Sequence, residues 1–138
     1  MKPKSIALVL LLSVLAVSAC GGSGLISSPG RGQTFQYSQT RHIARSTIQL
    51  HVESLDQERK LPPKAVHWSG SNDGATWVDL GNTNPLSIDA GDLASDLGID
   101  LPHGYWTVVM IRAEAEDEQG RPYVETVTIK LVHHPELD

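Results

Sequence analysis

The chain has 138 residues, and 16 acidic residues against 11 lysines and arginines give it a net charge of −5. A chain of this length supports one domain with a modest hydrophobic core. An acidic chain without a basic stripe is a poor partner for nucleic acid. Cys20 is the single cysteine, which excludes an intramolecular disulfide.

Residues 1–19 have the pattern of a secretory signal peptide. Lys2 and Lys4 give a positive start, the run 6–17 is almost wholly apolar, and small residues precede Cys20. The apolar run is too short and wrongly flanked for a membrane-spanning helix. The ending "VSAC" resembles the bacterial lipobox, which implies cleavage before Cys20 and a lipid on its thiol. An ordinary signal peptide with a chance cysteine is the alternative.

Residues 20–33, with the sequence CGGSGLISSPGRGQ, have the composition of a flexible tether. Gly21 in place of aspartate favours the outer membrane, by analogy with lipoprotein sorting. Loss of Lys2 and Lys4 takes the net charge from −5 to −7. We therefore expect a domain, 34–138, that contacts a membrane of the cell envelope through lipid on Cys20 and not through its acidic surface.

A period of two dominates the chain from residue 34 onward, which predicts β-strands. Apolar and polar residues alternate in five stretches, 47–53, 66–68, 86–89, 109–116 and 126–131, and residues 77–80 form a short, ambiguous run. Turn-forming residues separate them. Leu93 and Leu97, four positions apart before Gly98, predict a single helical turn. This order of short strands and turns predicts an all-β chain folded as an antiparallel β-sandwich.

The motifs "AVHWSGSNDG", "LPHGYW", "AEAEDEQG" and "ETVTIKLV" follow one another along the chain. Their order resembles that of bacterial immunoglobulin-like domains, related in style to polycystic-kidney-disease and fibronectin type III modules. The resemblance covers residues 26–132 and implies an immunoglobulin-like sandwich of about seven strands. It implies that Trp68 is a core residue, that Tyr105 lies near a tyrosine corner, and that Asp56 and Asp117 lie in turns. It implies no catalytic activity.

The stretch "SNDGATW", residues 71–77, resembles the Asp-box of sialidase-type propellers. It is one residue short of that motif and occurs once, in a chain too short for a propeller. Asp73-Gly74 is a favoured turn dipeptide, and Ser71, Asn72 and Asp73 can bond to local backbone amides. We interpret the stretch as a turn.

No catalytic or metal-binding motif stands out. The six histidines are scattered, without the spacing of a zinc site, and no nucleophile motif is present. The carboxylates of Asp56, Asp73, Asp117 and Glu118 are a candidate calcium set, but they equally suit solvated turns. We expect a non-catalytic protein without metal or cofactor; an enzyme with an unrecognised site is the remaining alternative.

The strand after Gly104 predicts a partner-binding surface. Its odd positions from 109 to 115 are apolar and are expected to face inward. The even positions Trp106, Val108 and Met110 are then outward and apolar, which predicts a hot spot for a protein partner in the envelope or for a homo-oligomer. A bulge near Val108 that turns Trp106 into the core is the structural alternative. The alternative function is a carbohydrate-binding module that stacks sugars on Trp77 and Trp106.

Overall fold

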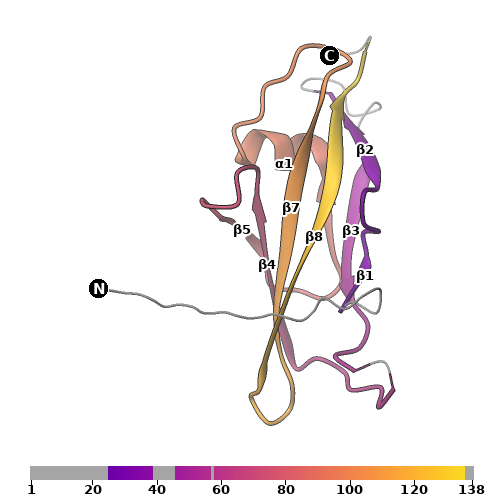
Figure 1. The fold of residues 1–138 in the computed structure, drawn as a ribbon, viewed down its shortest axis with the longest axis vertical. Coiled ribbons are helices and arrows are strands. Elements are labelled where there is room, and N and C mark those ends of the chain that lie inside the picture. Colours follow the sequence, from indigo (N-terminus) through magenta and orange to yellow (C-terminus); the bar gives the residue numbers. More distant parts are fainter. Residues whose placement is uncertain (1–24, 39–45, 57, 136–138) are drawn as a thin grey trace, which may run out of the picture.

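The computed structural model describes residues 25–38, 46–56 and 58–135. The predicted signal peptide, Cys20 and His42 lie outside these residues. The described residues form eight strands and one helix (Figure 1): β1 (Ile26–Ser28), β2 (Thr34–Tyr37), β3 (Thr47–Val52), β4 (Ala65–Ser71), β5 (Val78–Gly81), β6 (Leu86–Asp89), α1 (Ala90–Asp96), β7 (Trp106–Glu116) and β8 (Pro122–His133). No helix within the described ranges is long and apolar enough to cross a membrane.

The strands form two sheets, which confirms the predicted all-β class. The smaller sheet has the order β1-β3-β6, and the larger has the order β2-β8-β7-β4-β5. One pair departs from the purely antiparallel arrangement that we expected, because β2 runs parallel to β8. The other strand pairs are antiparallel.

The period-two pattern builds one hydrophobic core from both sheets. Ile48, Leu50 and Val52 alternate along β3 and are fully buried. The odd positions of β7 from 109 to 115 are buried in the same cluster, as expected. Trp68 of β4 belongs to this cluster with 0 % of its surface exposed, and its Nε1 donates to the carbonyl of Thr83 at 3.0 Å. The core position predicted for Trp68 is therefore confirmed.

Strand β7 keeps one register along its whole length. It pairs with β8 over every residue from Trp106, opposite Val132, to Glu116, opposite Pro122. Its pairing with β4 is equally uninterrupted. A bulge near Val108 would shift this register, so the alternative that turns Trp106 into the core is wrong.

Helix α1 confirms the helical turn expected before Gly98. The Asp89 carboxylate caps its first turn by accepting from the Gly91 amide. Leu93 and Ala94 are buried against the core, and Gly98 follows with a positive φ of 69°. Positive φ favours glycine, so the helix ends where the sequence predicts.

The loop between β4 and β5 is the turn that we inferred from "SNDGATW". The Asp73 carboxylate accepts from the amides of Ala75 and Thr76 at 2.8 and 2.9 Å. The hydroxyl of Ser71 accepts from the amide of Gly74 at 2.8 Å, and Gly74 has a φ of 78°. These local bonds show that the stretch is a hydrogen-bonded turn.

Two expectations need correction. Residues 26–28 form β1 and pair with β3, and the Gly32 amide donates to Thr128 at 2.8 Å, so the folded chain begins before Thr34. The serine side chains of β1 bond to β3 carbonyls, which explains a strand in a sequence with the composition of a tether. Tyr105 is 63 % exposed, and a side chain this exposed cannot pack as a tyrosine corner.

Candidate functional site

The outer surface of the larger sheet carries an apolar stripe, formed by Trp106, Val108 and Met110 of β7. Trp106 is 53 % exposed and Val108 is 42 % exposed, so the predicted outward direction of these side chains is confirmed. β7 has β8 on one side and β4 on the other. β8 pairs with the whole of the stripe, whereas β4 pairs with β7 only from Met110 onward, so Trp106 and Val108 lie beyond the end of β4.

Met110 contributes less exposed surface to the apolar stripe than its position predicts. It is half-buried, because the β4–β5 loop lies against it. A Cβ atom at Gly74 would lie 3.2 Å from the Met110 Cε, and Gly74 leaves this space free. Met110 thus lies under the loop, and Trp106 and Val108 provide the accessible area of the stripe.

Two cations flank the stripe, and each stacks on a tryptophan. The Lys130 Nζ lies 4.3 Å from the ring centroid of Trp106, and the Arg112 Cζ lies 4.1 Å from that of Trp77. Both contacts are cation–π interactions. The Arg112 Nε is buried and has no hydrogen-bond partner in the described part of the chain. Both tryptophans lie at the outer sheet surface. The sequence places Arg112 on this outward face, but it does not reveal that Arg112 and Lys130 stack on the rings, because these contacts join different strands and loops.

The same arrangement gives little support to a sugar platform of Trp77 and Trp106. Each ring has one face covered by a cation, which removes that face from stacking with a sugar. The two stacking pairs also start from different levels of β7, because Arg112 follows Trp106 by six residues, or about 20 Å between backbone positions along the strand.

A charged cluster lies on the outer surface farther along the sheet. The His67 Nε2 is 2.8 Å from the Asp79 carboxylate, and its Nδ1 is 3.3 Å from the Glu114 carboxylate. Hydrogen bonds to Glu114 and to Asp79 raise the pKa of His67 above its usual value. The cluster joins β4, β5 and β7, and the spacing of its residues in the sequence gives no sign of it.

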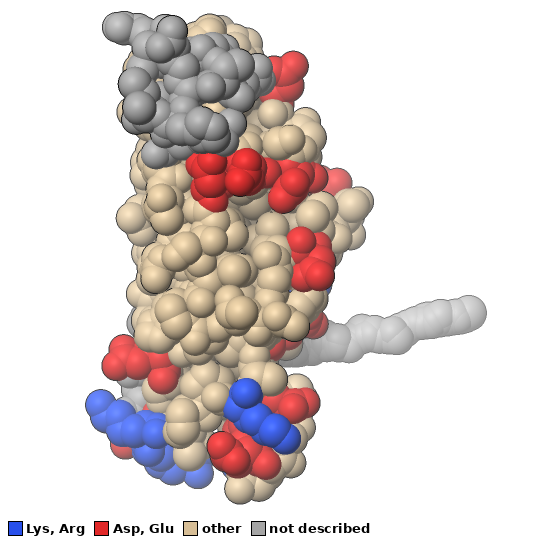
Figure 2. All heavy atoms as spheres, turned by 180° about the vertical axis from the view of Figure 1, so that it is seen from behind, with Lys and Arg blue, Asp and Glu red and all other residues tan. Residues whose placement is uncertain are grey.

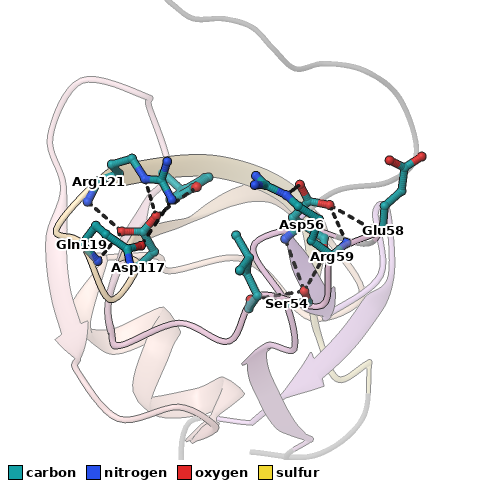
Figure 3. Close-up of polar contacts among 9 residues, drawn as sticks. Ser54, Asp56, Glu58, Arg59, Asp117, Gln119 and Arg121 are labelled. Atoms are coloured by element: carbon teal, nitrogen blue, oxygen red, sulfur yellow. Dashed lines mark hydrogen bonds and ion pairs between the residues drawn. The ribbon is translucent and has the colours of Figure 1, made fainter.

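The carboxylates proposed as a calcium set are not brought together. The Asp56 carboxylate accepts from the amides of Glu58 and Arg59 and from the Arg59 Nε (Figure 3). These bonds, the Arg59 amide first, lower the pKa of Asp56. Asp73 bonds within its own loop between β4 and β5. Among the described residues no three His, Cys, Asp or Glu side chains are placed to hold a metal ion.

Asp117 is held in the turn between β7 and β8. It is 2 % exposed and accepts from the Gln119 amide at 2.9 Å and from the Arg121 Nε at 2.7 Å (Figure 3). Burial alone would raise the pKa of Asp117, but hydrogen bonds from Arg121 outweigh burial and lower it. The role of this carboxylate is to close the turn, while Glu118 beside it is exposed.

The C-terminal histidines are structural. His133 is 3 % exposed and stacks between Tyr37, at 4.8 Å, and His103, at 4.3 Å between ring centroids. Its Nδ1 lies 2.5 Å from the Leu101 carbonyl. This stack packs the end of β8 against β2 and was not foreseen from the pair His133 and His134.

Comparisons with protein-family models, with curated proteins and with solved structures found no match.

Proposed function

We propose that the chain is a lipid-anchored protein of the bacterial cell envelope whose domain binds a protein partner through the apolar stripe. The proposed role is non-catalytic. One observation carries it: Trp106 and Val108, on an inner strand of the larger sheet, are 53 % and 42 % exposed. Exposed apolar side chains that adjoin one another are typical of contact surfaces, where tryptophan and methionine are enriched.

The charges beside the stripe indicate the chemistry of the partner. Lys130 and Arg112 flank the apolar residues and are held on tryptophan rings. Held side chains lose less freedom on binding, which favours them as contact residues. We therefore expect a partner with an apolar centre and acidic groups around it.

The strand order supports an immunoglobulin-like sandwich. In that fold strands A, B and E form one sheet and strands C, F and G the other. The order β1-β3-β6 is consistent with A-B-E, and the order β8-β7-β4-β5 is consistent with G-F-C followed by an additional strand. On this assignment Trp68 occupies strand C and the stripe lies on strand F.

The sequence before the fold supports the anchor. Cys20 ends a lipobox-like pattern and precedes Leu25, the first described residue, by five positions. Five residues span at most about 18 Å, so a lipid on Cys20 would hold the domain close to a membrane. A partner would then be found at or near that membrane, with the outer membrane favoured by Gly21.

Photo-crosslinking in cells tests the stripe directly. A photo-reactive phenylalanine analogue at position 108 should give a discrete crosslinked product, because this position faces outward. The same analogue at Glu118, exposed in the turn between β7 and β8, is the matched control and should give none. A product of equal yield from both positions, or none from position 108, rejects the proposal. A product of twice the chain's mass identifies a second copy and rejects a different protein as partner.

A pair of neighbouring substitutions then separates binding from stability. Val108→Thr should change the unfolding free energy by less than about 0.5 kcal/mol and should weaken binding of the crosslinked partner. Val109→Thr makes the same chemical change at a position that is 0 % exposed. Its buried hydroxyl should cost about 1–3 kcal/mol. If Val108→Thr destabilises the domain as much as Val109→Thr, the stripe belongs to the core.

A further inference from the structure

A second surface lies where the two sheets meet along the edges of β5 and β6. β5 ends the larger sheet and β6 ends the smaller one. Residues 82–85 connect the two strands. Because each strand is the last of its sheet, no described strand pairs with its outer edge. A groove of about 230 Å³ lies there, lined by Leu80 of β5, by Ser87, Ile88 and Asp89 of β6, and by Asp92, Leu93 and Asp96 of α1.

The floor of this groove is apolar. A Cβ atom at Gly70 would lie 3.2 Å from the Leu80 Cδ1 and 3.5 Å from the Leu93 Cδ1, so both leucines converge above this glycine. Ile88 completes the floor from β6. Leu80 and Ile88 are only half-buried, unlike Leu93, which is 1 % exposed. The groove therefore leaves apolar surface in contact with water.

The β6 edge is suited to pairing with another chain. β6 pairs with β3 on one side only, and three consecutive residues of it line the groove. An open strand edge presents backbone amides and carbonyls that an added strand can pair with. The four residues of β6 span about 13 Å, which sets the length of such a pairing.

The charge around the groove is acidic. Asp96 is exposed at the end of α1, and no lysine or arginine lines the groove. On the face seen in Figure 2, Lys and Arg side chains lie only at the lower end, while acidic side chains also lie higher. A segment that pairs with β6 and carries lysines or arginines beside the rim would gain favourable electrostatic contacts.

We propose that this groove binds an extended, basic segment of another protein, which adds as a strand to the edge of β6. An apolar side chain of the segment enters the groove over Leu80, Ile88 and Leu93. Its flanking lysines or arginines lie beside Asp96 and Asp92. This surface is distinct from the apolar stripe, which lies on the outer side of the larger sheet.

The test uses the full chain and a fluorescent, capped heptapeptide of sequence KVKLKVK. Fluorescence anisotropy should show saturable binding of this peptide. Two analogues report on the mode of binding: the same peptide with every backbone amide N-methylated cannot donate the backbone hydrogen bonds of a strand, and EVELEVE reverses the charge. Both should bind at least tenfold more weakly. Equal binding of the N-methylated analogue would overturn strand addition, and equal binding of the glutamate analogue would overturn the role of charge.

A matched pair of charge reversals locates the site. Asp96→Lys places a cation at the groove and, because it lies in the last turn of α1, favours the helix. It should weaken KVKLKVK binding about three- to tenfold without lowering the thermal midpoint. Glu118→Lys makes the same charge change in the exposed β7–β8 turn and should leave binding unchanged. An equal loss of affinity in both variants would show that the peptide is attracted by the net negative charge of the protein, and it would contradict binding at the groove.

Discussion

At the scale of single residues, Trp68 is the largest of the fully buried side chains in the described part of the chain. It is fully buried, and its indole nitrogen is bonded to the Thr83 carbonyl. Removal of a buried tryptophan side chain costs about 3–5 kcal/mol, against a total stability of about 5–15 kcal/mol. Trp68→Ala should therefore unfold, or nearly unfold, the domain at room temperature. Urea unfolding followed by circular dichroism measures this.

Trp106→Ala is the matched control for this prediction. Trp106 is 53 % exposed and stacks on Lys130, so its loss should cost about 1 kcal/mol or less. Similar unfolding midpoints for the two variants would contradict the assignment of Trp68 to the core and Trp106 to the surface.

The alternation of side chains along β7 was predictable, because a strand with a period of two places successive residues on opposite faces. The shielding of Met110 was not, since it depends on a loop that arrives from β4 and β5. The same holds for Lys130 beside Trp106. Lys130 lies opposite Val108 in the β7–β8 register, and that register cannot be read from either strand alone.

At the scale of the elements, His67 ties the edge strand β5 to β7 across β4. Its ring bonds to Asp79 of β5 and to Glu114 of β7. These carboxylates raise the pKa of His67 in the folded protein above that in the unfolded chain. The protonated ring therefore stabilises the fold fully below about pH 6.5, and this contribution is lost as the pH rises through the folded pKa.

Comparison of wild type with His67→Gln measures this contribution. The difference between their unfolding free energies should be largest below about pH 6.5 and should shrink at higher pH. The other histidines are present in both proteins, so their titration cancels in the difference. The effect should be small, because the His67 side chain is 45 % exposed and its partners 73 % and 46 %. A difference that grows with pH would contradict the bridge.

Strands β3, β4, β6, β7 and β8 were predictable as elements, and β1 was not. β1 has three residues, and its two serines have the composition of a tether. It is held by bonds to distant parts of the chain, such as the one from the Ile26 amide to the Glu125 carboxylate at 2.6 Å. The parallel pairing of β2 with β8 is equally non-local, since it joins the first part of the described fold to the last.

At the scale of the whole molecule, the connecting loops hold their own charges. Asp56 pairs with Arg59 between β3 and β4, and Asp117 pairs with Arg121 between β7 and β8. The hydrogen bond to Asp56 is the main cause of the raised pKa of Arg59, and the charge of Asp117 adds a smaller contribution (Figure 3). Each turn therefore contains both a carboxylate and the arginine that pairs with it. The two aspartates, which were candidate metal ligands in the sequence, accept hydrogen bonds from amides of their own loops.

The last prediction concerns how the domain is held in the cell. If Cys20 carries lipid, the wild-type chain should incorporate a labelled fatty acid, and Cys20→Ser should not. A chain in which residues 1–20 are replaced by an ordinary cleavable secretory signal should be soluble after a high-salt wash. This replacement also removes the apolar run 6–17, which could hold an uncleaved Cys20→Ser chain at the membrane.

The thermal midpoint of the soluble form should equal that of the anchored form, because the core begins with residues after Cys20. Label on the Cys20→Ser chain, or membrane retention of the replaced form, would show that something other than this thiol anchors the protein.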